Sequence, residues 1–221
     1  MQRGALQEVK SLASEKKSTA PKKRRNAAAT RAAILASARA AFARSGYDGA
    51  GVREIAAGAG VTAMLVNRYF GSKEKLFAEV CADTMATPMV LAEDNLAADD
   101  MARHMAEALV EITEAGATPL DGFLILLHSA SNKTAAKIGR AEIEKHHFKT
   151  LAGAMDGELV PQRAAMMLGL VAGFQLMRQA LGLSALTKAK PVDLVNLLTP
   201  LIRQLIVVEE KPEVTKKGKG H

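Results

Sequence analysis

Residues 51–73 read GVREIAAGAGVTAMLVNRYFGSK, and the order of small and apolar residues in this stretch decides the fold. Apolar side chains recur at helical spacing in its first half and predict a short helix: Val52, Ile55, Ala56 and Ala59. Gly51 is a permitted but weak N-cap for this helix, because it has no side-chain acceptor. Gly58 and Gly60 then allow a tight turn, since glycine readily adopts the left-handed conformation that a sharp bend needs.

A second helix is predicted over Ala63–Phe70, directly after the turn. Thr62 can cap this helix, and Val66 and Phe70 supply its inward face. A helix, a short turn and a second helix form the architecture that presents the second helix to the major groove of DNA. The stretch therefore predicts a helix-turn-helix.

The predicted second helix has an unusual outward face. The helical period points Met64, Asn67 and Arg68 outward. Ala63 and Leu65 flank them. Apolar Met64 and Leu65 near the tip fit contact with thymine methyl groups, which only the major groove displays. Alternatively, both side chains pack against neighbouring helices.

Two basic residues stand beside this face. Arg53, on the first turn of the first helix, can reach a phosphate or a guanine edge, or it is a solvated surface arginine. Lys73 follows Ser72 at the start of a further helix, where free backbone amides and the helix dipole favour a phosphate oxygen.

Helical spacing continues on both sides of the motif. Upstream, a helix from Asn26 ends at Gly46, and downstream, Ser72 caps a helix that Pro88 bends or ends. Further helices are predicted over Asp99–Ala115, Leu120–Ser131, Thr134–Met155, Gln162–Leu181 and Val192–Val207. No run of alternating apolar and polar residues indicates a strand, so the predicted fold class is all-α.

The chain is predicted to have four parts. Residues 1–25 form a disordered basic arm, and 26–78 form a three-helix helix-turn-helix DNA-binding domain. Residues 79–208 form a helical bundle for regulation, ligand binding and dimerisation, in which Pro200 should kink the last helix. Residues 209–221 form a disordered charged tail.

Positive charge is concentrated in the first third of the chain. Residues 1–80 hold 15 Lys and Arg against 6 Asp and Glu, whereas residues 81–221 hold 15 against 17. A phosphate backbone is attracted to such a field, because each neutralised phosphate releases a counterion. Eight of the 15 basic residues lie in Met1–Arg25, so this arm follows the DNA backbone or is a solvated tail.

Other classes of protein find little support. No nucleophile elbow, phosphate loop or zinc signature is present, so an enzyme is not expected. The apolar stretch Ala164–Met177 is too short to span a bilayer, and no apolar segment follows the basic start. The single cysteine, Cys81, fits a reducing cytoplasm. Adjacent His146 and His147 would point apart on a helix, so neither a metal nor another cofactor is expected.

Taken together, these motifs resemble the TetR (tetracycline-repressor-like) family. The resemblance covers about Arg31–Val80 and rests on these segments: Ala33-Ile34-Leu35, Ala41-Phe42, Ser45-Gly46-Tyr47, Val52-Arg53-Glu54-Ile55-Ala56, Ala59-Gly60-Val61 and Tyr69-Phe70-Gly71-Ser72-Lys73-Glu74-Lys75-Leu76-Phe77. It implies a homodimer that binds a near-palindromic operator on double-stranded DNA, usually as a repressor that a small molecule releases. A sequence-indifferent architectural DNA-binding protein is the alternative.

The resemblance also assigns roles to individual residues. Those expected to approach bases are Arg53, Ala63, Met64 and Leu65, and those expected to hold phosphates are Thr62, Asn67, Tyr69 and Lys73. Two residues depart from the family pattern. Asn67 replaces an aromatic residue, so it could read adenine instead of holding a phosphate. Gly51 replaces the usual capping threonine and removes a hydroxyl near the backbone.

The last two predicted helices are apolar on more than one face, so another surface must bury them. A four-helix dimer interface, the arrangement that the family uses, would contain Gly169, Gly173, Leu194, Leu198, Leu201 and Leu205; a monomeric core is the alternative. An apolar effector pocket would be lined by His104, Met105, Phe123, His128, Met167 and Phe174. The alternative to a pocket is that the methionines are ordinary core residues and the histidines ordinary surface or core residues.

Overall fold

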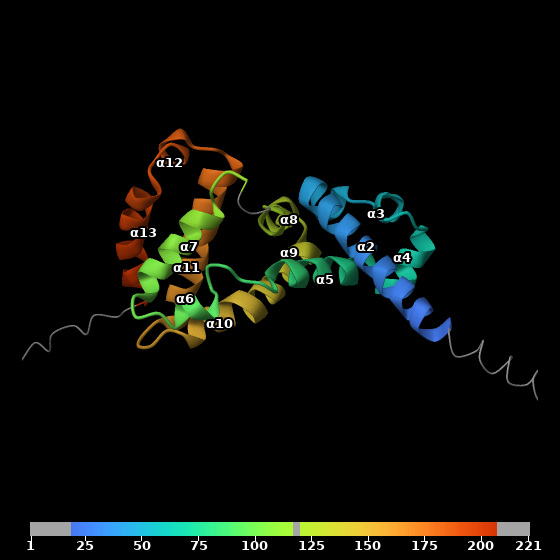
Figure 1. Cartoon of the computed structure of the whole chain (residues 1–221), viewed down its shortest axis with the longest axis horizontal. Coiled ribbons are helices and arrows are strands. Elements are labelled where there is room, and N and C mark those ends of the chain that lie inside the picture. The colour runs from blue at the N-terminus through green and yellow to red at the C-terminus, as the bar shows by residue number, and fades with distance from the viewer. Residues whose placement is uncertain (1–18, 117–119, 207–221) are drawn as a thin grey trace, which may run out of the picture. The chain divides into compact units, whose positions relative to one another are not determined.

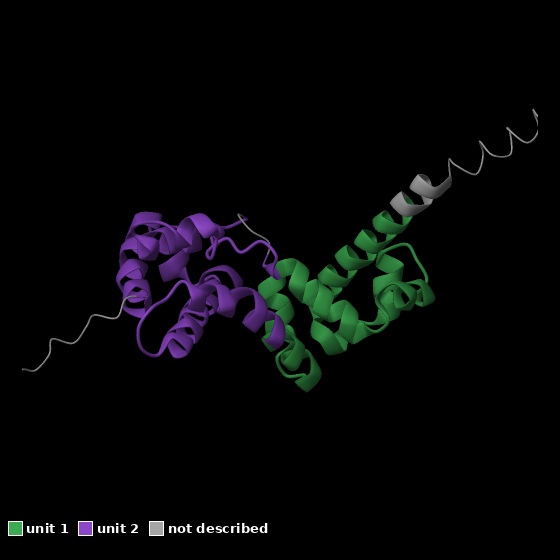
Figure 2. Cartoon of the chain, turned by 90° about the horizontal axis from the view of Figure 1, so that it is seen from below, with its two compact units in different colours: residues 1–84, 121–140 green, residues 85–120, 141–221 purple. Residues whose placement is uncertain are grey.

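The computed structural model describes residues 19–116 and 120–206, and its regular structure is helical throughout (Figure 1). No strand occurs within these two ranges, so the all-α prediction is confirmed. The chain forms two compact units (Figure 2). Unit 1 is built from residues 1–84 and 121–140, and unit 2 from residues 85–120 and 141–221.

The described residues of unit 1 form four complete helices, almost all of a fifth and the first part of a sixth. These are α2 (Thr19–Gly49), α3 (Val52–Gly58), α4 (Ala63–Phe70), α5 (Lys73–Met85), α8 (Asp121–Ser129) and the first part of α9 (Lys133–Ile143). Helix α2 begins at Thr19, within the segment predicted as a disordered arm. The rest of the predicted arm and the predicted tail at 209–221 lie outside the described residues.

The division of the chain differs from the predicted boundary at residue 78. The predicted regulatory domain included residues 79–84 and 121–140, but these segments pack with the helix-turn-helix in unit 1. Buried α8 residue Ile125 lies in the same core cluster as Phe42 of α2 and Phe77 of α5. The Phe42 and Phe77 rings meet edge to face with centroids 5.0 Å apart, a favourable aromatic arrangement.

Unit 2 holds the remaining helices. They are α6 (Glu93–Leu96), α7 (Met101–Ile112), η1 (Glu144–Phe148), α10 (Lys149–Gly153), α11 (Val160–Gln175), η2 (Leu176–Ala180), α12 (Ser184–Thr187) and α13 (Pro191–Ile206). The sequence did not indicate the short helices α6 and α12, nor the π-helical turns η1 and η2. Helix α13 continues through Pro200 to Ile206 as one helix.

Two buried arginines of unit 2 bind helix ends. Arg163 donates to the carbonyls of Leu205 and Ile206 at the end of α13, at 3.1 and 2.9 Å. Arg178 donates to Thr113 Oγ1 and to the Val110 carbonyl at the end of α7. A cation at a helix C-terminus pairs with carbonyls that lack intrahelical donors, so both guanidinium groups stabilise a helix end by hydrogen bonding.

A bend in α2 at Gly46 is held by α8. Gly46 has φ 65° and ψ −174°, a backbone conformation that is available almost only to glycine. Beside the bend, the Tyr47 amide donates to Ser129 Oγ at 2.9 Å, and His128 Nδ1 donates to the Ala43 carbonyl at 2.8 Å. A Cβ atom on Gly46 would collide with the His128 carbonyl group. The bend therefore requires glycine for its conformation and for the close approach of α8.

Replacing Gly46 with alanine is expected to lower the free energy of unfolding by at least about 2 kcal/mol, because strain and a backbone collision add together. Urea unfolding of Gly46→Ala beside the unaltered chain measures this change. Gly153→Ala is the matched control, since a Cβ atom there meets nothing within 4 Å and φ is not positive. Equal stability of the Gly46→Ala variant and the unaltered chain would show that the bend tolerates a side chain.

Candidate nucleic-acid interface

Hydrogen bonds fix α3 and the turn that follows it. Ser37 Oγ of α2 donates to the Ile55 carbonyl of α3 at 2.8 Å. At the start of α3, the Glu54 carboxylate accepts from the Gly51 amide at 3.4 Å. Gly60 has φ 67°, and the Val61 amide donates to the Ala56 carbonyl at 2.9 Å, which closes the turn. The helix, turn and helix predicted from the sequence are present at the expected positions.

Helix α4 is capped at both ends as predicted. Thr62 Oγ1 accepts from the Leu65 amide at 3.4 Å, and Gly71, with φ 83°, ends the helix. Ser72 Oγ accepts from the Lys75 amide at 3.3 Å and starts α5. These caps satisfy backbone groups that have no intrahelical partner, so both ends of α4 are set by local sequence.

The exposed face of α4 agrees with the predicted phase of the helix. Val66 and Phe70 are buried, and Met64 is 81% exposed. The exposed residues of this face are Met64, Asn67 and Arg68, and the half-buried ones are Ala63, Leu65 and Tyr69. An apolar side chain that points into water at the start of a helix lies where the N-terminal residues of a recognition helix contact bases.

The arginines of unit 1 differ in their partners. Three of them form ion pairs with carboxylates: Arg31 with Glu79, Arg39 with Asp121 and Arg44 with Glu54. Within the described parts of the chain, Arg53 of α3 and Arg68 of α4 form no such pair, and both are exposed. Each of the two helices of the motif thus carries an arginine that is available for an external anion.

Lys73, at the start of α5, is held by Tyr47. Its Nζ lies 4.5 Å from the centroid of the Tyr47 ring, within range of a cation–π interaction. Burial first, and then a hydrogen bond to the neighbouring Glu74 carboxylate and the charge of that group, raise the pKa of Tyr47 to about 12. Sequence reasoning missed this use of Tyr47; the adjacent Gly46-Tyr47 pair is the signal that could have indicated it. The contact holds the ammonium group against the Tyr47 ring.

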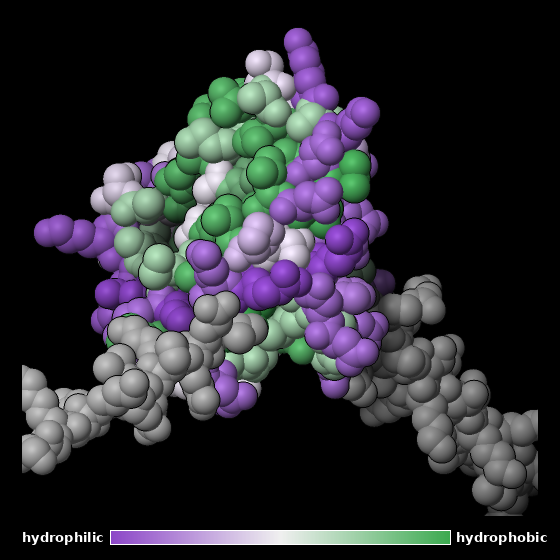
Figure 3. Space-filling view, turned by 90° about the vertical axis from the view of Figure 1, so that its left-hand side faces the viewer, coloured by the Kyte–Doolittle hydropathy of each residue, from purple (hydrophilic) through white to green (hydrophobic). Residues whose placement is uncertain are grey.

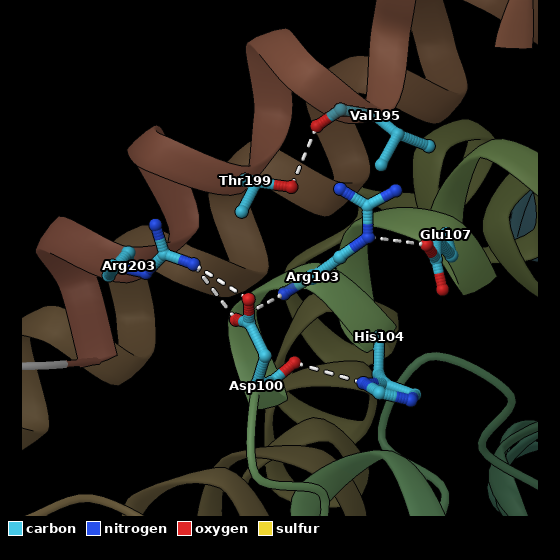
Figure 4. A network of polar contacts seen from close by, with 7 residues as sticks. All are labelled: Asp100, Arg103, His104, Glu107, Val195, Thr199 and Arg203. Atoms are coloured by element: carbon cyan, nitrogen blue, oxygen red, sulfur yellow. Dashed lines mark hydrogen bonds and ion pairs between the residues drawn. The ribbon is translucent and has the colours of Figure 1, made fainter. Parts of the chain in front are cut away.

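The predicted pocket residues do not come together as expected. Phe123 and His128 lie on α8 in unit 1, and the His128 ring binds the Ala43 carbonyl. His104 is exposed, and its ring nitrogen Nδ1 binds the Asp100 carbonyl at 3.0 Å (Figure 4). In the same network, Arg203 of α13 donates to both Asp100 carboxylate oxygens at 2.9 Å, and this bonding lowers the pKa of Asp100. His104 is therefore part of the capping structure at the start of α7.

Three other predicted pocket residues belong to the core of unit 2. Met105 and Met167 are fully buried, and half-buried Phe174 packs against the same cluster. A hollow of ≈ 460 Å³ in unit 2 is lined by different residues: Pro88, Leu91, Glu93, Leu96, Ala97 and Thr150. Of the predicted lining residues, His104 and His128 therefore bind backbone carbonyls, Met105, Met167 and Phe174 belong to the core of unit 2, and Phe123 is half-buried on α8.

Unit 2 has polar side-chain atoms that are buried without a hydrogen-bond partner, a feature that the sequence did not predict. These atoms are Glu142 Oε2, His146 Nε2, His147 Nδ1 and Gln179 Oε1. Of these four atoms, Glu142 Oε2 and His146 Nε2 lie 3.3 Å apart, within ion-pair distance, so His147 Nδ1 and Gln179 Oε1 are the two without such a contact among the described residues. Burial lowers the pKa of His147, and the charge of His146 lowers it further. Among the described residues, no group of three or more His, Cys, Asp or Glu side chains is arranged to hold a metal ion.

Some of the residues predicted for a dimer interface are buried in unit 2, and others are exposed. Leu194 and Leu198 are buried in the core of unit 2 and Leu205 is packed against it, so Leu194 and Leu198 are corrected to core residues. Gly169 is exposed, Leu201 is 49% exposed, and a Cβ atom on Gly169 or Gly173 would meet open space. Leu197 of α13 and Met166 of α11, 67% and 63% exposed, were not in the predicted set.

Removing Arg53 is expected to weaken binding of a duplex selected from a random library by about tenfold or more, because its guanidinium has no other partner. Arg140→Ala is the matched control, since Arg140 is also an exposed arginine of unit 1 but lies on α9. Fluorescence anisotropy at several salt concentrations measures both affinities. If the two variants bind equally well, Arg53 takes no part in binding.

Comparisons with known proteins agree with this architecture. Residues 34–80 match a family model described as bacterial regulatory proteins, tetR family, and residues 99–206 match the tetracyclin repressor-like C-terminal domain. No curated protein matches the sequence. None of the helices within residues 19–116 and 120–206 combines the length and the apolar character needed to span a bilayer.

Solved structures share the fold at low sequence identity. A TetR-family regulator from Streptomyces coelicolor is 22% identical with a TM-score of 0.54, covering 81% of this chain and 95% of its own. GusR from Salmonella enterica is 15% identical with a TM-score of 0.64, covering 80% and 95%. NalD, the secondary repressor of the MexAB-OprM multidrug efflux pump in Pseudomonas aeruginosa, is 18% identical with a TM-score of 0.55, covering 82% and 98%.

Both family models describe parts of one kind of protein, and together they span the helix-turn-helix and most of unit 2. The chain belongs to the TetR family of DNA-binding transcription regulators.

Proposed function

We propose that the protein is a homodimeric repressor that binds a near-palindromic operator and is released by a small molecule. The observation that carries this proposal is the outward face of α3 and α4, where Arg53 and Arg68 are exposed and pair with no carboxylate of residues 19–116 and 120–206. Met64 extends the same face with an apolar group. Such a face suits the major groove, which offers phosphates, base edges and thymine methyl groups together. In this proposal the protein is not an enzyme: it acts by binding DNA. It does so in the cytoplasm.

The proposed dimer uses the exposed sides of α11 and α13. Apolar side chains gather in a band on the face that carries α13, and hydrophilic residues border it (Figure 3). The exposed apolar residues of these two helices are Met166, Val192, Leu197 and Leu201, and Gly169 and Gly173 leave room for a close approach. An apolar face of this kind is stable in water when a second copy covers it.

Replacing two exposed leucines with glutamate tests both the proposed dimer and the proposed palindromic operator. Leu197→Glu with Leu201→Glu is expected to give a monomer by light scattering, because two carboxylates would be buried in the interface. The monomer should also bind a selected palindromic duplex and a single half-site with similar affinity. Met89→Glu is the control, since Met89 is an exposed apolar residue of unit 2 outside both helices. A dimer that survives both replacements would place the interface elsewhere.

A second candidate is a sequence-indifferent architectural DNA-binding protein. The observation that favours it is the basic run Lys22–Arg25, which lies at the start of α2. The two candidates differ in sequence preference, because phosphate contacts carry no sequence information. Selection of duplexes from a random library by the full chain separates them: an enriched palindrome supports the repressor, and equal binding of all duplexes at physiological salt supports the architectural protein.

We infer that the effector binds in unit 2 and has hydrogen-bonding groups as well as apolar surface. The support is a pair of buried polar atoms, His147 Nδ1 and Gln179 Oε1, that have no hydrogen-bond partner among the described residues. A buried polar atom without a partner costs free energy, so a ligand or water that bonds to it is favoured. The π-helical turn η1, which contains His146 and His147, is a kind of distortion that is frequent at functional sites.

A thermal-shift screen tests this effector site. A compound that raises the melting temperature is expected to lose most of its effect on a His147→Leu variant and to keep it on His104→Leu, because His104 is exposed and binds its own helix cap. The same compound should reduce duplex binding by the unaltered chain. Equal stabilisation of both variants would move the effector away from η1, and no stabilising compound would count against ligand release.

A further inference from the structure

We infer that Met64 and Asn67 together make α4 a reader of A·T base pairs. In each operator half-site, Met64 meets the methyl group of a thymine, and Asn67 bonds to N6 and N7 of an adenine about one or two base pairs away. The inference rests on the proposed function, since it requires α4 to enter the major groove. It names the part of the operator sequence that the helix selects.

Met64 carries the thymine half of the inference. Its side chain is 81% exposed on the first turn of α4, whereas Leu65 is half-buried and Val66 and Phe70 are buried. The first turn of a recognition helix is the part that contacts base edges. The thymine C5-methyl is the apolar group that base pairs present in the major groove, so it is the partner that a thioether fits there.

Asn67 carries the adenine half. It is exposed, and its side chain forms no hydrogen bond with any residue in the described ranges, in contrast to two other asparagines. Asn95 donates to the Met89 carbonyl, and Asn132 donates to Asp48 Oδ1. A free side-chain amide can donate to one atom and accept from another, the pattern that adenine offers in the major groove.

The two side chains are neighbours on the helix. Residues three apart share one face, so Met64 and Asn67 point into the groove side by side. The same face excludes another base, because Ala63–Phe70 contains no Asp or Glu to accept from the amino group of cytosine. Arg68 has a guanidinium that suits guanine or phosphate, and it lies one turn beyond Met64.

Chemically altered duplexes test each contact separately. The full chain first selects its operator from a random library, and each half-site is expected to hold a thymine and an adenine at neighbouring positions. Deoxyuridine in place of that thymine removes only the methyl group and is expected to weaken binding about threefold or more. Met64→Ala should bind the thymine and deoxyuridine duplexes equally.

The adenine contact is tested in the same way. An adenine analogue with carbon in place of N7 is expected to weaken binding by the unaltered chain about fivefold or more, and Asn67→Ala should not distinguish it from adenine. Arg68→Ala is the comparison variant: it should bind more weakly but keep both sensitivities. Circular dichroism checks that each variant is folded, and Asn67→Gln gives a second variant in which the amide is displaced.

The outcomes separate this inference from the proposed function. An enriched palindrome without A·T pairs at the altered positions overturns the inference and leaves the repressor proposal standing. Equal loss of affinity for all duplexes on Asn67→Ala, with an unchanged salt dependence, assigns the neutral Asn67 amide to a phosphate and also overturns it. If no sequence is enriched, the proposed function itself fails.

Discussion

The bonds between α8 and the bend of α2 hold unit 1 together. His128 and Ser129 bind backbone groups on both sides of Gly46, and the glycine lets the two helices approach. The bend directs the chain from α2 into Tyr47, whose ring packs on Phe77 with centroids 5.1 Å apart and lies against Lys73. The angle at which α3 and α4 leave α2 therefore depends on a helix that follows them by about fifty residues in the sequence.

The helix-turn-helix was predictable from the sequence because each of its signals is local. Thr62, Gly60 and Gly71 act within a few residues of their own positions, and Val66 with Phe70 fixes the phase of α4. The place of α8 was not predictable, because its bonds to Ala43 and Tyr47 join residues more than eighty positions apart. The π-helical turns were missed since no residue pattern in the sequence marks a single wider turn.

The sequence could predict which residues of the candidate site are exposed, but not which arginines form ion pairs. The sequence indicated that Arg53 and Arg68 are exposed, but only the fold pairs Arg31, Arg39 and Arg44 with carboxylates. In α13, leucines occupy most sides of the helix, so their spacing could not tell the core residues Leu194 and Leu198 from exposed Leu197. The pocket prediction gave too much weight to residue type, since His104 and His128 each bind a backbone carbonyl.

The order of segments along the chain affects how such a regulator folds during synthesis and how its domains can be exchanged by gene fusion. Unit 1 uses residues 1–84 and 121–140, with part of unit 2 encoded between them. During synthesis the bend at Gly46 has no α8 to bind until the ribosome has passed Ser129, so the DNA-binding unit is completed late. A gene fusion that transplants residues 1–84 alone would leave Phe42 and Phe77 without Ile125. Exchange of sensor modules between regulators of this kind must therefore carry both segments of unit 1.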